Sequence, residues 1–134
     1  MEAIVFDSSA FMACLAPDES PPKTFQDLLK TAHIFVPALW PFEMMNSLLI
    51  SLRRQRLSID DIQRATLTLS SLDLEVEPAS LSATEHAIWP LAKELALTVY
   101  DAAYLELASR RGLPLATLDE ALRKAAKRKK VKLL

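Results

Sequence analysis

The chain has 134 residues, of which 51% are hydrophobic and 25% are charged, and its formal net charge is −1. This length fits one domain that can bury a core without disulfides, and the composition excludes a disordered protein. No apolar run approaches the ~20 residues of a membrane-spanning helix, and the start, MEAIVFDSSA, carries an acid where a signal peptide would be basic. We therefore expect a cytoplasmic protein with a single domain over residues 1–134.

The first half of the chain alternates strand and helix signals. It begins with a strand at AIVF (3–6), a helix over 8–15, the Pro-rich break APDESPPK and a helix over 24–32. A strand at HIFV (33–36) and a helix over 38–55 follow, and the N-cap pattern SIDD begins another helix at Ser58.

The second half continues the alternation. LEVE (74–77) predicts a third strand, and a helical segment over 80–97 follows, which Pro90 should kink or divide. We then expect a helix over 97–112, a strand at LPLAT (113–117), a helix over 119–129 and a terminal strand at VKLL (131–134). Short strands separated by helices predict an α/β fold with a mostly parallel sheet covered on both faces.

Four carboxylates have positions that can bring them to one edge of such a sheet. Asp7 directly follows the first strand, and Asp119 lies three residues after the fourth strand ends at Ala116. Asp101 lies near the head of the helix before that strand, and Glu43 lies early in the helix after the second. Sites in open parallel sheets form beyond the carboxyl ends of the strands, near the point where the strand order reverses.

Helix capping is the alternative explanation for three of these acids. An N-cap Asp is worth ~1 kcal/mol, and capping alone can account for Asp7, Asp101 or Asp119 taken singly. It fails for Glu43, which lies inside its helix among apolar neighbours, with no basic residue within a turn or two. Hard oxygen ligands without His or Cys suit Mg²⁺ or Mn²⁺, and the commonest task of such a cluster is phosphoryl chemistry.

Three segments, IVFDSSAFMACL, VPALWPFEMMNSLL and LTVYDAAYLELASRRGLPLATLDEAL, together resemble PIN-domain proteins of the VapC type, the toxins of type II toxin-antitoxin systems. The resemblance covers essentially the whole chain. It implies a three-layer α/β/α domain with about four to five strands, and a ribonuclease that depends on Mg²⁺ or Mn²⁺. It also implies three partners: an RNA substrate, a small VapB-type antitoxin and a second copy of the chain.

The resemblance also implies roles for individual residues. The acids that match the family's catalytic and metal-binding positions are Asp7, Glu43, Asp101 and Asp119. Ser8 and Thr117 match small hydroxyl positions that help to hold water, metal or a carboxylate. Asn46 matches the family's ExxN pattern, and its place on the helical face of Glu43 fits a role in orienting that acid or bridging to a metal-bound water.

Other residues have ordinary structural explanations. We expect Tyr100 to pack behind Asp101 and Tyr104 to be a core residue rather than a surface that stacks on RNA bases. Cys14, among apolar neighbours, is expected to be core filler rather than a reactive thiol. The two histidines, His33 and His86, are expected to be solvated or to cap helices. The two tryptophans, Trp40 and Trp89, are expected to lie in the core or at an interface.

Basic residues are unevenly distributed. Seven of the 16 fall between Arg123 and Lys132. The helix dipole accounts for part of this cluster, but its density also favours attraction of a phosphate backbone. The candidate RNA-binding residues are Arg110, Arg111, Arg123, Lys124, Lys127 and Arg128. The alternative is a solvated or solubilising surface, and this alternative also stays open for Arg53, Arg54 and Arg56.

The apolar residues between 39 and 52 can form a groove for a partner helix. Two rival functions stay open. One is a PIN nuclease that acts in RNA processing or DNA cleavage, and the other is a binding module that kept the fold and lost the chemistry.

Overall fold

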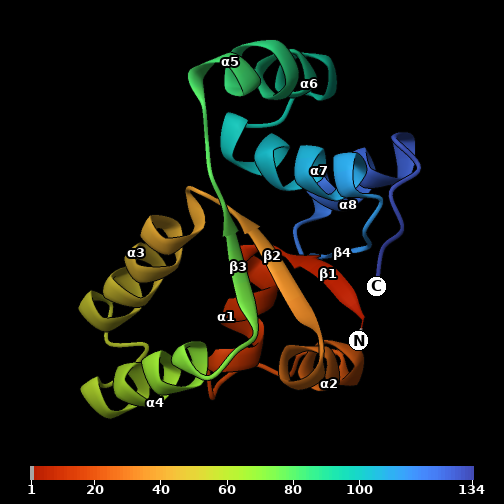
Figure 1. Cartoon of the computed structure of the whole chain (residues 1–134). Helices are drawn as coiled ribbons and strands as arrows, with labels where there is room; N and C mark the ends of the chain where they lie inside the picture. Colours follow the sequence, from red (N-terminus) through yellow and green to blue (C-terminus); the bar gives the residue numbers. More distant parts are fainter. Residues whose placement is uncertain (1) are drawn as a thin grey trace.

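The computed structural model describes residues 2–134 and shows an α/β fold built on four parallel strands (Figure 1). The strands are β1 (Ala3–Phe6), β2 (His33–Pro37), β3 (Leu74–Glu77) and β4 (Leu115–Ala116), in the order β3-β2-β1-β4. The register sets Ile4 of β1 opposite Ile34 of β2, and Val5 opposite Leu115 of β4. The order therefore reverses at β1, which lies between β2 and β4.

Helices cover the sheet, and the predicted α/β class is confirmed. The principal ones are α1 (Ser8–Leu15), α2 (Lys23–Thr31), α3 (Trp40–Arg53), α4 (Ile59–Ser70), α7 (Val99–Arg111) and α8 (Glu120–Arg128). Each lies within a few residues of the helix predicted from the sequence. Among residues 2–134, no helix has the length and apolar character needed to cross a membrane.

The segment between β3 and α7 is divided, as Pro90 predicts. It consists of α5 (Leu81–Ala83), a π-helical turn, η1 (Thr84–Ile88), and α6 (Trp89–Leu95). Pro90 lies in the first turn of α6, where a missing backbone donor costs least. Ala96, in the left-handed conformation with φ of 54°, ends α6.

The predicted terminal strand over residues 131–134 is wrong. Only Leu133 pairs with the sheet, through a single parallel bridge to Leu115. The Leu115 N–H donates to the Lys132 carbonyl, and the Leu134 N–H donates to the Leu115 carbonyl. Because β4 is only two residues long, it offers no longer edge for a fifth strand to extend along.

The core is built around the central strand. Ile4, Val5 and Phe6 are fully buried. Phe11 of α1 links Phe6 to Trp40 of α3, with ring centroids 5.2 and 5.0 Å apart, distances at which aromatic pairs attract each other. This packing fixes the carboxyl end of β1 and the start of α1, and so the position of Asp7 between them.

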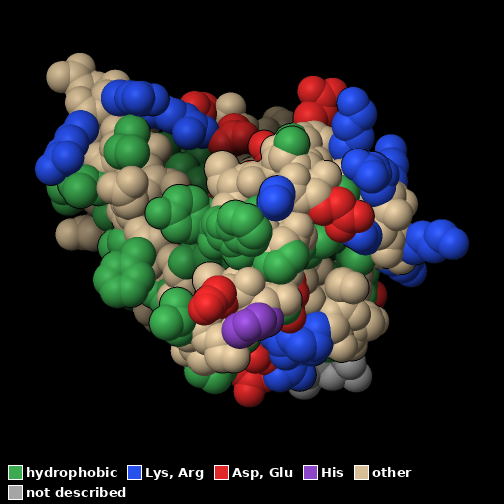
Figure 2. Space-filling model, turned by 90° about the horizontal axis from the view of Figure 1, so that it is seen from above, with side chains coloured by type: hydrophobic (Ala, Val, Ile, Leu, Met, Phe, Trp, Pro, Cys, Tyr) green, Lys and Arg blue, Asp and Glu red, His purple; other side chains and the backbone are tan. Residues whose placement is uncertain are grey.

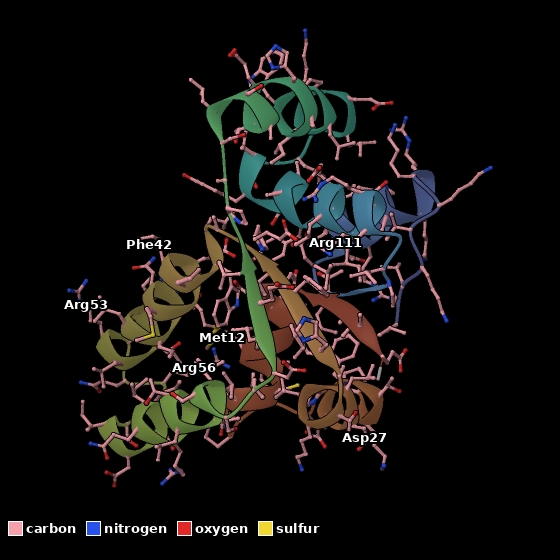
Figure 3. All side chains as sticks on the ribbon, in the orientation of Figure 1. Met12, Asp27, Phe42, Arg53, Arg56 and Arg111 are labelled. Carbon is pink, nitrogen blue, oxygen red and sulfur yellow. The ribbon has the colours of Figure 1, made fainter. Side chains whose placement is uncertain are left out.

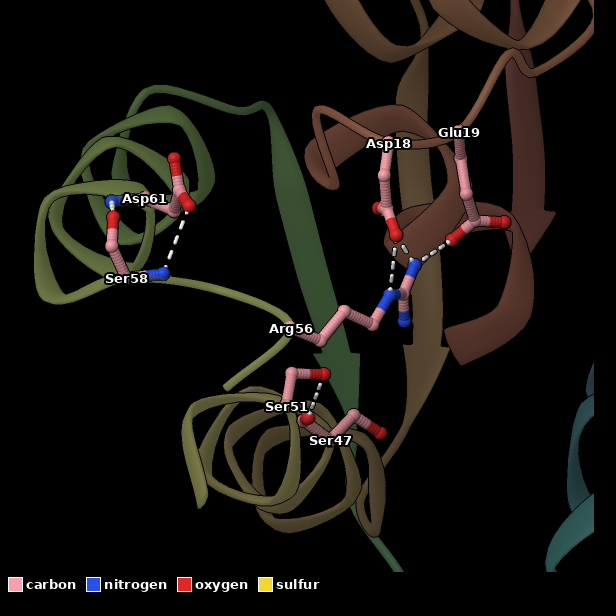
Figure 4. Close-up of polar contacts among 7 residues, drawn as sticks. All are labelled: Asp18, Glu19, Ser47, Ser51, Arg56, Ser58 and Asp61. Carbon is pink, nitrogen blue, oxygen red and sulfur yellow. Dashed lines mark hydrogen bonds and ion pairs between the residues drawn. The ribbon is translucent and has the colours of Figure 1, made fainter. Parts of the chain in front are cut away.

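Polar contacts fix the chain between α3 and α4 (Figure 4). Arg56 donates to Asp18 at 2.9 Å and to Glu19 at 2.6 Å, so this arginine joins the α3–α4 connection to the α1–α2 connection. The N-cap predicted at Ser58 is confirmed, because Ser58 and Asp61 form a reciprocal capping box at the start of α4.

Candidate active site

The four carboxylates singled out in the sequence lie at the carboxyl edge of the sheet. Asp7 directly follows β1, and Asp119 lies three residues beyond β4. Glu43 is in the first turn of α3 and Asp101 is in the first turn of α7. All four residues line one cavity of about 190 Å³. The fold therefore gathers acids from four separate segments, at the strand-order reversal where α/β sites form.

Asp7 is the most deeply buried of the four, with 4% of its surface exposed. Its Oδ1 accepts hydrogen bonds from the Ala10 N–H at 2.9 Å and the Ser9 hydroxyl at 2.6 Å, while Oδ2 accepts one from the Thr117 hydroxyl. Burial raises the pKa of Asp7, and these donors act against that rise. The Ala10 bond makes Asp7 the N-cap of α1, so one carboxylate both caps a helix and faces the cavity.

Glu43 is held by two hydroxyl groups that converge on the same oxygen. Its Oε1 accepts from the Ser8 hydroxyl at 2.6 Å and from the Tyr104 hydroxyl at 2.6 Å. Tyr104 is 1% exposed, which agrees with the predicted core position. Its contact with Glu43 was not predicted, and the available signal was that a buried Tyr hydroxyl usually needs a partner.

Asp101 is not the cap of its helix, and the capping explanation for it was wrong. Thr98 is the N-cap of α7, because its hydroxyl accepts from the Asp101 N–H at 3.0 Å. The pKa of Asp101 is raised to about 6, by burial first and then by the charges of Asp119, Asp7 and Glu43. The charges of the other three carboxylates therefore act on Asp101 directly.

Asp119 is both a helix cap and a cavity residue. Its Oδ2 accepts from the Leu122 N–H at 2.8 Å at the start of α8. Its own N–H donates to the Thr117 hydroxyl at 3.0 Å. Thr117 is fully buried. Because its hydroxyl also donates to Asp7, Thr117 links Asp7, which follows β1, to Asp119, which follows β4.

Two neighbouring residues lie farther from the acids than the sequence indicated. Asn46 is exposed and does not line the cavity, whereas Ser47 does. Ser47 lies four residues after Glu43, one helical turn later, so the turn of α3 carries this serine rather than Asn46 to the cavity. Tyr100 does not pack behind Asp101: 62% of its surface is exposed.

Comparison with known proteins identifies the fold. The family model of the PIN domain matches residues 4–128. The chain belongs to the PIN domain family. It is similar to the crystal structure of PAE2754 from Pyrobaculum aerophilum, at 25% sequence identity and a TM-score of 0.71, over 99% of this chain and 83% of that one. A comparison with curated proteins found no match.

PIN domains are generally nucleases that use divalent metal ions, and the donor set in this PIN domain suits such an ion. The lining contains four carboxylates, and none of the described lining residues is basic. A bound cation would offset the desolvation cost of burial and the mutual repulsion, which together raise the pKa of Asp101. Within residues 2–134, no group of three acidic, His or Cys side chains is placed to ligate one ion together, so ligation by these acids would require their side chains to move.

Some basic residues of this PIN domain are engaged within the fold. Arg111 pairs with Glu77 and lies 4.2 Å from the Phe35 ring centroid, and Figure 3 shows it on α7. Arg110 donates to Glu106 at 2.7 Å. Arg123 donates to the Thr117 carbonyl at 2.8 Å. These contacts favour structural roles for all three arginines.

The other candidate cations of this PIN domain face solvent. Lys124, Lys127 and Arg128 of α8 are exposed. Figure 2 shows Lys and Arg side chains gathered on the right of the upper face, the side on which α8 lies in Figure 1. Their exposure leaves them accessible to a polyanion.

The remaining candidates lie outside the cavity. His33 is 2.9 Å from Asp73 and 3.4 Å from Glu75, and the hydrogen bonds to these carboxylates raise its pKa. Cys14 is half-buried, and burial raises the pKa of its thiol to about 11, so it is a poor nucleophile at neutral pH.

Proposed function

We propose that this PIN domain is an endoribonuclease that hydrolyses RNA phosphodiester bonds with Mg²⁺ or Mn²⁺. The observation that supports this proposal is the cavity lined by carboxylates from four elements, with no cation among its described lining residues. The residues that would hold the ion are Asp7, Glu43, Asp101 and Asp119. When bound, such an ion activates water and stabilises the leaving oxygen.

In this proposal the rest of the chain positions the acids. Ser8 and Tyr104 both hold Oε1 of Glu43, and Oε2 is the oxygen that would ligate the ion. Thr117 and Ser9 hold Asp7. All four groups are neutral donors, so they orient the carboxylates without cancelling their charge.

The exposed cations of α8 are proposed to bind the RNA backbone. The helix begins at the cavity, with Asp119 as its cap, and its nine residues extend about 13 Å from there. Lys124, Lys127 and Arg128 therefore lie along a path that leads away from the cavity. Their attraction to phosphates is independent of sequence and weakens with salt.

The test is cleavage of a fluorescently labelled single-stranded RNA by the full chain with Mg²⁺, Mn²⁺ or EDTA. We expect cleavage with either metal, none with EDTA, and a loss of several orders of magnitude in Asp119→Asn, which retains the cap. Undiminished cleavage after exhaustive chelation would refute the metal assignment. Cleavage of DNA but not RNA would identify a deoxyribonuclease, and binding of RNA without cleavage would identify a silent module.

A combined variant tests the RNA path. Replacing Lys124, Lys127 and Arg128 with Ala should weaken RNA binding and reduce the slope of log K against log salt. Lys23→Ala is the matched control, since Lys23 is an exposed cation of α2 paired with Asp27. An unchanged salt slope in the triple variant would refute this path.

We propose further that the chain is the toxin of a VapBC-type pair and that its partners are a small antitoxin and a second copy of itself. Apolar side chains of α3, including Phe42, Met45 and Leu49, are exposed, and Figure 3 shows Phe42 near the start of this helix. A hollow of about 270 Å³ lies between α3 and α4. Trp40 and Met44 line it.

Expression in bacteria tests this second proposal. Induction of the wild-type chain should arrest growth, Asp119→Asn should not, and co-expression of the protein encoded beside it should restore growth. Sedimentation should give twice the mass of the monomer. Normal growth despite active ribonuclease would favour an RNA-processing role instead.

A further inference from the structure

The first turns of α7 separate the acidic cavity from a second hollow of about 200 Å³. Asp101 and Tyr104 line the acidic cavity, whereas Tyr100, Ala103 and Leu107 line the second hollow. Successive helical residues are about 100° apart, so these two sets occupy adjoining faces of α7. The two hollows thus share one helix as a wall.

The second hollow has apolar walls and a polar rim. The end of β2 contributes Pro37, and the residues that follow it contribute Ala38 and Leu39. The Tyr100 ring stands at this hollow with 62% of the residue's surface exposed. At the rim, Arg110 is fixed by its contact with Glu106.

The size and chemistry of this hollow fit one flat, uncharged ring with polar edges. Its volume is below the ~300–1,000 Å³ of sites for drug-sized ligands. The apolar walls suit the faces of such a ring, and the fixed charges at the rim suit hydrogen bonds to its edges. The one cation among the described lining residues, Arg110, is paired with Glu106, and Glu77 also lines the hollow, which makes it a poor site for a phosphate.

We propose that this hollow binds the nucleobase of a nucleotide next to the scissile phosphate, with Tyr100 as its stacking surface. The inference rests on the proposed nuclease function, which places a phosphate at the neighbouring acidic cavity. Single-stranded RNA is commonly bound through unstacked bases that lie on aromatic side chains. A side chain of a partner protein is the competing occupant.

Tyr100→Ala tests the proposal with little risk to folding, because most of the Tyr100 surface is exposed. The probes are a short single-stranded RNA of mixed sequence and versions with an abasic nucleotide on either side of the mapped cleavage point. We expect Tyr100→Ala to lower kcat/KM about 5- to 150-fold, the range for loss of one stacking aromatic. One abasic version should lower wild-type kcat/KM by a similar factor and lower that of Tyr100→Ala little further.

Two more variants sharpen the test. Tyr100→Trp, which keeps a stacking ring, should retain most of the activity. Trp89→Ala is the control, because Trp89 is an exposed aromatic of α6 with the Lys93 ammonium 5.4 Å from its ring centroid. It should cleave like the wild type.

The outcomes distinguish a failure of the nucleobase site from a failure of the proposed nuclease function. Wild-type cleavage with unchanged kcat/KM in Tyr100→Ala would overturn the nucleobase site alone, as would equal cleavage of abasic and intact RNA. Loss of self-association in Tyr100→Ala, with cleavage retained, would assign the hollow to a subunit contact. If the wild type neither binds nor cleaves RNA, the nuclease proposal fails and the nucleobase site fails with it.

Discussion

Asp101→Asn measures the stability cost that burial and the charges of the other three carboxylates impose on ionised Asp101. The pKa of Asp101 is raised from its ordinary value of 3.8 to about 6. Each pH unit of difference corresponds to about 1.36 kcal/mol, so the ionised side chain destabilises the folded protein by at most about 3 kcal/mol. Partial exposure reduces the expected value to about 1–2 kcal/mol. The Asn variant loses a favourable charge at a helix N-terminus, worth about 0.3–1 kcal/mol, and should gain about 1 kcal/mol overall.

The effect has a defined pH window. Because the pKa of Asp101 is higher in the folded state, the folded chain binds this proton more tightly than the unfolded chain. Stability therefore falls as pH rises from about 4 to about 6, and stays low above that range. Asn cannot ionise, so we expect Asp101→Asn to be more stable than the wild type at pH 8 and no more stable at pH 4.

Thermal melts in EDTA at both pH values provide the measurement. For a chain of this length, 1 kcal/mol corresponds to roughly 3–5 °C in Tm. Asp60→Asn is the matched control, because Asp60 is an exposed acid in the first turn of α4 and lies outside the cavity lining. It should lose the helix-dipole contribution alone and melt slightly below the wild type at pH 8.

If the four acids share an ion, saturating Mg²⁺ should make the wild type more stable than Asp101→Asn. Saturating metal stabilises by RT ln(1 + [L]/Kd), about 2.7 kcal/mol at a hundredfold excess over Kd, and Asp101→Asn should lose much of that gain together with RNA cleavage. A variant that melts like the wild type at pH 8 in EDTA, keeps the full Mg²⁺ shift and cleaves normally would refute the shared site.

Three further substitutions test single contacts. Tyr104→Phe keeps the buried ring but removes a donor to Glu43, and should lower kcat about 10- to 100-fold, which is about 1.5–3 kcal/mol; a wild-type kcat would show that Ser8 alone suffices. Thr117→Val should lower the free energy of unfolding in urea by about 1–3 kcal/mol, and Thr117→Ser should restore most of it, whereas equal losses in both would point to packing. Arg56→Ala removes an exposed ion pair and should cost less than about 1 kcal/mol, less still in high salt; a larger, salt-independent loss in urea unfolding would contradict this.

The sheet and its acidic edge could be predicted because both have local signals. Short apolar runs between amphipathic segments predict buried parallel strands, and an acid directly after such a run, as at Asp7, is placed at the carboxyl edge by the chain itself. Glu43 was predicted from the cost of placing a charge among apolar residues with no cation nearby. These inferences need no knowledge of distant contacts.

The errors arose where two local solutions compete or where a contact is distant in sequence. Around Asp101, both Thr98 and Asp101 are good capping residues, and only the observed start of α7 decides between them. The Tyr104–Glu43 hydrogen bond joins residues 61 apart, and the Arg111–Glu77 contact joins residues 34 apart. No periodicity in the sequence encodes such pairs, so the anchoring of Glu43 and the engagement of Arg111 required the fold.

Hydroxyl donors allow the carboxyl edge of the sheet to fold while its carboxylates keep their negative charge. Buried carboxylates need hydrogen bonds, and Lys or Arg would supply strong ones, but a bound guanidinium or ammonium would also neutralise the charge that attracts a metal ion. Ser8, Tyr104 and Thr117 supply donors without positive charge. Burial and the repulsion that remains together raise the pKa of Asp101. The fold thus accepts a stability cost at this edge, and a divalent cation is the ligand that can offset it.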